Sequence, residues 1–303
     1  MSKVNERIPE NLFVIEEAPN EYLKNRWNTL HGIDSIKQTL MSYILNCLDQ
    51  SRINAWCEKN YPEHKNLKEI LIQQLSFSGK ILLVGDPGTG KTQAIEGVAF
   101  AVAEKIGKVY LMRARVLRSK FVGESSSRIV QVFKYAKEKA REAPVLLFFD
   151  EFDSVAPNRS NAQMHEEVKA AVNTLLEEME KVAPSDRVIV IAATNLFEIA
   201  VDNAADRRFD LVIYFRRPSY FQRLNLLSIL LKPFGIDKQT LITLARRTRG
   251  YTYADIKKLV KNALNTALTQ NRRLNCEDLF SSLKYVKPTR GYRHFKNRGL
   301  HES

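Results

Sequence analysis

The chain has 303 residues with a hydrophobic fraction of 44% and a charged fraction of 27%, which is the composition of an ordinary globular protein. It contains no run of about 18 apolar residues and no basic-then-apolar start, so we expect no membrane-spanning helix, no secretory signal and a cytoplasmic location. The formal net charge is +13, and the whole excess lies in residues 211–303, where 19 Lys and Arg stand against 5 Asp and Glu.

The first part of the chain carries few regular patterns. Residues 1–26 are polar and acidic, and we expect a short flexible arm there. Apolar residues recur at helical spacing over residues 36–48, which predicts a helix. Residues 54–75 have no clear period and are expected to form a loop with helical pieces.

From residue 80 onward, short apolar segments alternate with amphipathic segments. The expected strands are residues 80–85, 108–114, 145–150, 187–194 and 211–215, and the expected helices are 92–107, 125–142 and 165–182. Because these strands are apolar throughout, both faces of the sheet must be covered, which predicts a parallel α/β sheet flanked by helices. Helices alone are expected afterwards, at residues 219–231, 238–248, 252–271 and 276–284.

These changes of pattern predict the domain organisation. We expect a flexible arm over residues 1–26, an α/β nucleotide-binding domain over 27–217, an all-helical domain over 218–284, and a basic tail over 285–303. We place the boundary between the α/β domain and the helical domain near residue 217, because both the composition and the charge change there. We find no internal repeat.

The segment GDPGTGKT, residues 85–92, fits G-x-x-x-x-G-K-[ST] between an apolar strand and a helix, which is the context that a P-loop requires. Its glycines let the backbone curl so that N–H groups point at phosphate oxygens, and the helix N-terminus adds positive potential. Lys91 is expected to reach the β- and γ-phosphates of ATP, and Thr92 to bind Mg²⁺. The expected nucleotide-binding residues of the loop are Asp86, Pro87, Gly88, Thr89, Gly90, Lys91 and Thr92.

The segment RSKFVGESSS, residues 118–127, places Phe121 in a small and polar stretch without apolar periodicity. A large aromatic side chain on a solvated turn has no partner in the pattern around it. The sequence thus leaves open whether Phe121 serves a binding function or is an accidental loop residue.

The segment VLLFFDEFDS, residues 145–154, is expected to form a buried strand that ends in Asp150 and Glu151. Because a carboxylate is costly to bury, two of them at the end of such a strand indicate a functional role. Asp150 is expected to hold Mg²⁺ through water, and Glu151 to polarise the attacking water. The alternative is a solvated strand end. A position about sixty residues downstream of a P-loop favours the catalytic interpretation.

Two further groups lie near expected strands. Asn195 ends the segment VIVIAATN, and its amide could hold the attacking water, touch the γ-phosphate or simply start a turn; spacing alone does not decide. Arg207 and Arg208 stand side by side before the last strand. Adjacent guanidiniums cannot both be buried without anions, so they are either solvated or directed at the phosphates of another subunit.

In this order, the motifs resemble those of the AAA ATPases in the narrow sense over about residues 27–268. The P-loop departs from the family at Asp86, where proline is usual. Residues 192–210 are similar to the stretch that carries sensor 1 and the arginine fingers, in the short form of the microtubule-severing and ESCRT-disassembling branch. Residues 119–125, SKFVGES, are similar to the first pore loop. The residues that this likeness assigns to client binding are Lys120, Phe121 and Val122.

The resemblance also assigns the base end of the nucleotide site. The segment WNTLHGID, residues 27–34, is similar to the segment that holds the adenine, with Gly32 and Ile33 among the contacting residues. Residues 248–263 resemble the family's lid segment, which assigns Ala254 to the nucleotide. Tyr253 stands where the family has a glycine that faces the nucleotide.

The resemblance implies a P-loop NTPase domain with a five-stranded parallel sheet and a small helical lid, Mg²⁺-dependent ATP hydrolysis, and a homo-oligomer that is commonly a hexamer. It further implies that a protein client is remodelled or threaded through a central pore, without naming the client. The alternative is a nucleic-acid motor or loader, because the tail at residues 284–303 interleaves basic and aromatic residues. The basic third could instead bind an acidic partner or anionic surface, or be solvated. A scaffold that uses ATP only to assemble is disfavoured by the intact catalytic motifs.

Overall fold

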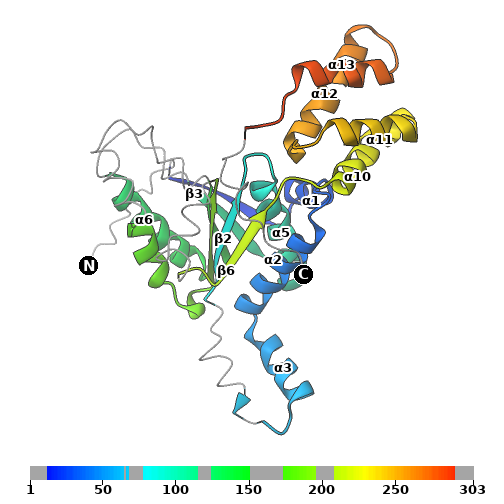
Figure 1. The fold of residues 1–303 in the computed structure, drawn as a ribbon. Coiled ribbons are helices and arrows are strands. Elements are labelled where there is room, and N and C mark those ends of the chain that lie inside the picture. Colours follow the sequence, from blue (N-terminus) through cyan, green and yellow to red (C-terminus); the bar gives the residue numbers. More distant parts are fainter. Residues whose placement is uncertain are drawn as a thin grey trace, which may run out of the picture.

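The computed structural model describes residues 12–64, 66–67, 78–114, 124–150, 173–195 and 208–290. At its centre lies a six-stranded sheet with the order β1-β3-β4-β5-β2-β6, and Figure 1 shows helices on both sides of it. The strands are β1 (Phe13–Ala18), β2 (Lys80–Gly85), β3 (Val109–Ala114), β4 (Val145–Phe149), β5 (Val188–Thr194) and β6 (Leu211–Phe215).

Five of the strands, β2 to β6, pair in parallel with one another, as the apolar segments predict. The expected number of strands is too small by one, because β1 adds to the edge and pairs antiparallel with β3. The flexible arm expected over residues 1–26 is therefore wrong for its described part. Its polar composition reflects an edge strand, in which Glu16 forms an ion pair with Arg113 of β3 and Phe13 stacks on Tyr135, with ring centroids 4.7 Å apart.

Helices cover both faces of the sheet, with α6 on one side and α1, α2 and α5 on the other (Figure 1). Alternate residues of β2 serve the two faces: Ile81 and Leu83 belong to one buried cluster, and Leu82 and Val84 to the second. The helices of this domain are α1 (Glu21–Asn28), α2 (Asp34–Leu48), α3 (Gln50–Asn60), α5 (Lys91–Ile106) and α6 (Glu124–Lys139) with helical residues 173–180, and a 3₁₀ turn η2 spans Pro184–Asp186.

The four expected C-terminal helices are present and form a separate lid. They are α10 (Tyr220–Leu231), α11 (Lys238–Arg247), α12 (Tyr253–Thr269) and α13 (Cys276–Tyr285), with a 3₁₀ turn η3 at Lys232–Phe234. Ser219, Thr252 and Asn275 begin α10, α12 and α13 with capping boxes, in which the cap and the third helical residue bond each other's backbone N–H.

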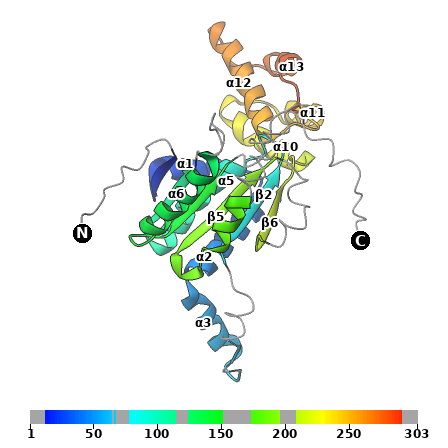
Figure 2. The ribbon, with the colours of Figure 1, turned by 90° about the vertical axis from the view of Figure 1, so that its left-hand side faces the viewer.

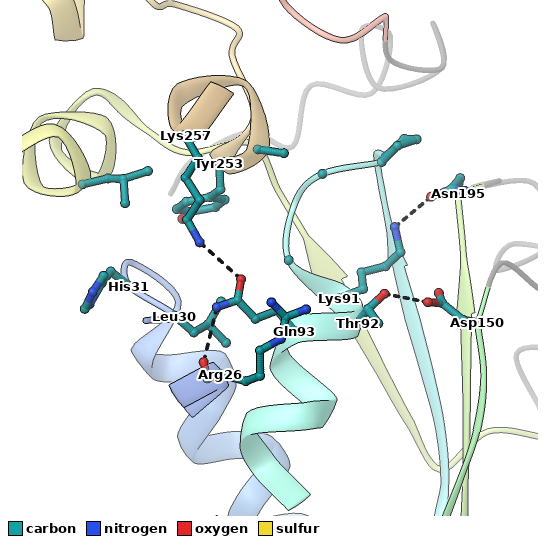
Figure 3. Close-up of a pocket in the computed structure, with 15 residues that line it drawn as sticks. Arg26, Leu30, His31, Lys91, Thr92, Gln93, Asp150, Asn195, Tyr253 and Lys257 are labelled. Carbon is teal, nitrogen blue, oxygen red and sulfur yellow. Dashed lines mark hydrogen bonds between the residues drawn. The ribbon is translucent and has the colours of Figure 1, made fainter. Parts of the chain in front are cut away.

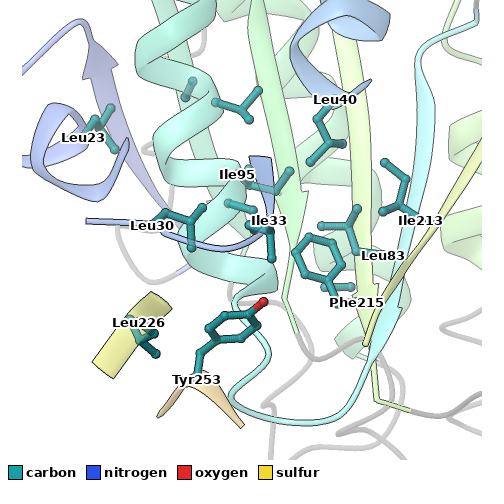
Figure 4. Packing of buried hydrophobic residues seen from close by; sticks show 14 of the residues in the cluster. Leu23, Leu30, Ile33, Leu40, Leu83, Ile95, Ile213, Phe215, Leu226 and Tyr253 are labelled. Carbon is teal, nitrogen blue, oxygen red and sulfur yellow. The ribbon is translucent and has the colours of Figure 1, made fainter. Parts of the chain in front are cut away.

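The lid sits at one end of the sheet, and α3 projects at the opposite end (Figures 1 and 2). One buried cluster runs without a break from the sheet into the lid, since Leu83 and Phe215 share it with Leu226 and Tyr253 (Figure 4). The change from strand to helix falls between Phe215 and Tyr220. Within the described part of the chain, no helix is both long and apolar enough to cross a bilayer.

Candidate nucleotide site

A cavity of about 270 Å³ opens where the end of the sheet, the α1–α2 connection and the lid meet (Figure 3). It lies at the carboxyl ends of parallel strands, which is where open α/β sheets bind ligands. Its lining residues are Arg26, Leu30, His31, Pro87, Gly88, Gly90, Lys91, Thr92, Gln93, Asp150, Asn195, Leu226, Tyr253, Ala254 and Lys257.

The floor of the cavity is the loop that joins β2 to α5. The loop turns through Gly88 (φ +79°) and Gly90 (φ +102°), where an L side chain would be strained. Thr89 closes the turn by donating from its backbone N (3.3 Å) and its hydroxyl (2.7 Å) to the Asp86 carbonyl oxygen. Because α5 begins at Lys91 and its first three residues line the cavity, the N-terminus of the helix faces the cavity, which is the arrangement that binds phosphate at a helix N-terminus.

Lys91 and Asn195 meet at the inner end of the cavity. The Lys91 ammonium donates to the Asn195 amide oxygen at 2.8 Å and to the Gly85 carbonyl oxygen at 2.5 Å. Asn195 directly follows β5, and Lys91 begins the helix after β2, the strand beside β5 in the sheet. The alternative that Asn195 only starts a turn does not explain why its side chain points at this lysine (Figure 3).

Thr92 and Asp150 form the second polar pair. The Thr92 hydroxyl donates to Oδ2 of Asp150 at 2.7 Å, so a hydroxyl and a carboxylate lie together beside Lys91. Hard oxygen donors of this kind are the ligands that Mg²⁺ prefers, and it usually keeps several waters beside one or two protein groups. This pair fits the expected Mg²⁺, which Thr92 and Asp150 would hold against the phosphates.

The outer end of the cavity is apolar and belongs to Leu30, His31, Leu226 and Tyr253. Burial, followed by the charge of the nearby Lys257, lowers the pKa of His31 from its ordinary value, which favours the neutral imidazole. Apolar walls and an uncharged ring suit the flat face of a nucleobase.

Gly32 and Ile33 lie beside this end of the cavity but are not among its lining residues. The Gly32 carbonyl oxygen accepts two hydrogen bonds from the lid, from Gln222 Nε2 at 2.6 Å and from the Tyr253 hydroxyl at 3.0 Å. Ile33 is 5% exposed and packs in the core (Figure 4). The expected contacts of both residues with adenine therefore remain predictions.

The lid also touches the phosphate loop directly. Ala254 is the second residue of α12, and its backbone N–H donates to the Gly88 carbonyl oxygen at 3.2 Å. A Cβ atom at Gly88 would lie 2.9 Å from both the Ala254 methyl and the Thr252 hydroxyl, so only glycine allows this approach. Ala254 thus lines the cavity from the side opposite to the sheet.

Among the cavity residues that sequence reasoning missed, three are polar: Arg26, Gln93 and Lys257. Gln93 accepts from Lys257 Nζ at 3.3 Å and donates to the Arg26 carbonyl oxygen at 3.3 Å, which ties α12 to α1. The Arg26 guanidinium is held by Glu96, a buried carboxylate that also pairs with Arg113. The sequence signal for this network is Glu96, an acidic residue among the apolar residues of α5. A carboxylate that is buried there requires a cationic partner.

Of the remaining expected site residues, one belongs to the described part of the chain. Arg208 is described; its Nε lies 3.0 Å from Oε1 of Glu180, and it does not line the cavity of its own chain. The others lie outside the described residues, so their roles remain predictions. They are Glu151, Arg207 and the pore-loop residues Lys120, Phe121 and Val122.

The contact between Tyr253 and Gly32 makes a prediction about nucleotide binding. Burial raises the pKa of Tyr253 to about 12, so its hydroxyl stays a donor at pH 7. Tyr253→Phe keeps the ring in the cavity but removes one bond between lid and core, and we expect KM for ATP to rise about two- to tenfold, the effect of one neutral hydrogen bond. Steady-state ATPase assays measure this, with Tyr285→Phe as control because Tyr285 is 78% exposed. An unchanged KM would contradict a role for the hydroxyl.

Comparisons with known families support the assignment of this cavity. Residues 81–217 match the family described as "ATPase family associated with various cellular activities (AAA)". Residues 240–282 match the family described as "AAA+ lid domain".

Similar proteins cover nearly the whole chain. Cell division protein C of Sulfolobus acidocaldarius is 30% identical over 91% of this chain and 70% of its own length. CD-NTase-associated protein 6 of Escherichia coli is 28% identical over 90% of this chain and 94% of its own. The chain spans only about a third of the length of several other curated relatives that it matches.

Among solved structures, a chain of the E. coli MS115-1 HORMA:CdnC:Trip13 complex superposes with a TM-score of 0.80 and 26% identity. The likeness covers 93% of this chain and 98% of that chain.

Proposed function

Because the chain belongs to the AAA family of ATPases, we propose that it uses ATP hydrolysis to remodel a protein client. ATP hydrolysis with Mg²⁺ is the activity of the family. The observation that carries the proposal of a protein client is the end-to-end likeness to the structure of the HORMA:CdnC:Trip13 complex. That likeness covers 93% of this chain and 98% of the other chain, whereas two longer relatives are matched over about a third of their own length.

In the proposed active site, each group has one task. Lys91 neutralises charge on the phosphates, Thr92 and Asp150 hold Mg²⁺, and Asn195 positions the attacking water or the γ-phosphate. Glu151, which follows Asp150 in the chain, accepts a proton from the attacking water. The bonds from Lys91 to Asn195 and from Thr92 to Asp150 support this division, because they gather four of these groups around one loop.

We further propose that the active site is completed in a homo-oligomer, with Arg207 and Arg208 reaching the phosphates bound to a neighbouring subunit. The oligomer would be a hexameric ring or spiral. In each subunit the pore-loop residues Lys120, Phe121 and Val122 would face the central axis. An aromatic side chain can grip an extended polypeptide by apolar contact without reading its sequence. This assigns a binding role to an aromatic residue for which the sequence pattern around it indicates no core position.

The client class that best fits the comparisons is a HORMA protein, since the solved complex contains one beside its Trip13 subunit. The basic C-terminal third offers weaker support for nucleic acid. Several of its arginines act inside the chain: Arg223 is 6% exposed and donates to the Ala245 carbonyl oxygen, and Arg272 donates both Nη groups to Asp278. Arginines that form hydrogen bonds inside the chain are not available to bind the phosphates of a nucleic acid.

Capture of the client tests the proposal. A Glu151→Gln variant is expected to bind ATP, assemble and turn over very slowly, so that a bound client stays bound. We expect a HORMA protein to be enriched when this variant is incubated with ATP in lysate and the bound proteins and nucleic acids are identified. The matched control is Glu151→Gln/Phe121→Ala, which should bind ATP equally and lose the client, because Phe121 does not belong to the nucleotide site.

Two outcomes would contradict the proposal. Enrichment of nucleic acid with no protein client would favour the alternative of a nucleic-acid motor. Equal capture of the client by the single and the double variant would show that Phe121 is only a loop residue.

A further inference from the structure

The second residue of the phosphate loop is an acid, Asp86, where AAA ATPases usually have proline. Its side chain is 10% exposed, and its carbonyl oxygen accepts from the Lys91 ammonium at 3.3 Å. A carboxylate in a loop built to bind phosphates opposes its ligand, because like charges in a partly buried site repel each other. The loop therefore needs a compensating positive charge besides Lys91.

Arg217 supplies that charge from the segment between β6 and α10. Its Nε donates to Oδ2 of Asp86 at 2.7 Å. The two remaining nitrogens donate to the Gly250 carbonyl oxygen at 2.5 Å and to the Thr289 carbonyl oxygen at 2.8 Å. One planar guanidinium thus joins the phosphate loop, the loop before α12, and the segment after α13.

The segment after α13 is itself fixed to the lid. The Thr289 backbone N–H and hydroxyl both donate to the Asp255 carboxylate, at 2.9 and 2.7 Å. Val286 is 3% exposed, and its carbonyl oxygen accepts from the Tyr251 hydroxyl at 2.5 Å. Arg217 is therefore bonded both to the lid, at Gly250, and to a C-terminal segment that the lid holds in place.

We propose that Arg217 is a positioning residue for ATP binding. It neutralises Asp86, so that the phosphate loop accepts a triphosphate, and through Gly250 and Thr289 it couples the loop to the lid and to residues 286–290. The proposal rests on the assignment of the cavity to ATP. It concerns a pair of residues that the motifs of the family do not contain.

Charge removal at each member of the pair separates this role from simple packing. Arg217→Met keeps the length of the side chain but removes the positive charge beside Asp86, and we expect the Kd of a fluorescent ATP analogue to rise about tenfold, the effect of one partly screened charge near the phosphates. Asp86→Asn leaves the positive charge unpaired and should lower the Kd. The double variant Asp86→Asn/Arg217→Met should return close to the wild-type Kd.

A merely structural Arg217 predicts a different pattern. Loss of its bonds to Gly250 and Thr289 would then weaken binding equally in Arg217→Met and in the double variant, and that result would overturn the proposal. So would a Kd that is raised in Asp86→Asn. Arg216→Ala is the matched control, because this exposed neighbour carries the same charge and should leave the Kd unchanged. A wild-type protein that binds no ATP analogue would instead overturn the assignment of the cavity.

The coupling has its own measurement. Hydrogen exchange at the Thr289 amide, which is bound to Asp255, should slow when ATP is added to the wild-type protein. The same amide should not respond to ATP in Arg217→Met at a saturating ATP concentration. An equal response in both proteins would remove Arg217 from the coupling while leaving its charge role to the affinity data.

Discussion

Replacing Lys91 with alanine is expected to lower kcat/KM for ATP by roughly 10²–10³-fold, the size of effect seen when one charge-stabilising donor is removed from an active site. The side chain is 7% exposed and reaches the end of the cavity, where it bonds the Asn195 amide oxygen and the Gly85 carbonyl oxygen. No other ammonium or guanidinium that lines the cavity in the described part of the chain shares these contacts. Coupled ATPase assays and titration with a fluorescent ATP analogue measure the loss.

The control for this experiment is Lys105→Ala, which removes an exposed lysine from the last turn of the same helix. Its activity should equal that of the wild type, because Lys105 lies at the opposite end of α5 from the phosphate loop. Thermal unfolding of both variants distinguishes loss of chemistry from loss of structure. A Lys91→Ala protein that folds normally and keeps its ATPase activity within threefold would contradict the assignment of Lys91.

Sequence patterns located the sheet and the residues at the inner end of the cavity with little error. The segments 80–85 and 211–215 agree with β2 and β6 to the residue, because a fully buried strand requires an unbroken apolar run that ends where the chain leaves the core. Since parallel strands carry their carboxyl ends to one edge, groups at those ends, such as Asp150 and Asn195, had to lie together. Local pattern and topology thus suffice for this part of the site.

Features that depend on contacts between residues far apart in the chain could not be predicted from local sequence patterns. β1 carries two glutamates among its six residues and lies at the edge of the sheet, and its partner β3 is about a hundred residues away in the chain. The segment therefore shows no strand pattern that could be recognised locally. The walls of the outer cavity depend on how the lid meets α1, as in the contacts of Gln93 with Arg26 and Lys257. Arg217 belongs to no motif, since two of its three acceptors are backbone carbonyls that any sequence could provide.

The second large effect is expected at Arg208. Its guanidinium pairs with Glu180, and the two side chains are 34% and 54% exposed. An ion pair this exposed contributes little stability, so the side chain can exchange Glu180 for a phosphate of a neighbouring subunit at small cost. If it acts there as an arginine finger, Arg208→Ala should reduce kcat by roughly 10³–10⁵-fold. Binding of ATP should persist, because Arg208 does not line the cavity of its own chain.

Mixing inactive subunits tests whether Arg208 acts across an interface. If a site needs Glu151 from one subunit and Arg208 from its neighbour, then Arg208→Ala and Glu151→Gln subunits together form some interfaces with both groups intact. ATPase activity should therefore recover at intermediate ratios and vanish at either extreme, whereas Arg246→Ala, which alters an exposed arginine of the lid, should be active alone. Subunits that assemble together, as shown by light scattering and pull-down, yet recover no activity at any ratio would falsify action in trans. In that case Arg208 would have to act on the nucleotide of its own chain. Its ion pair with Glu180 and its absence from the lining of that cavity argue against this.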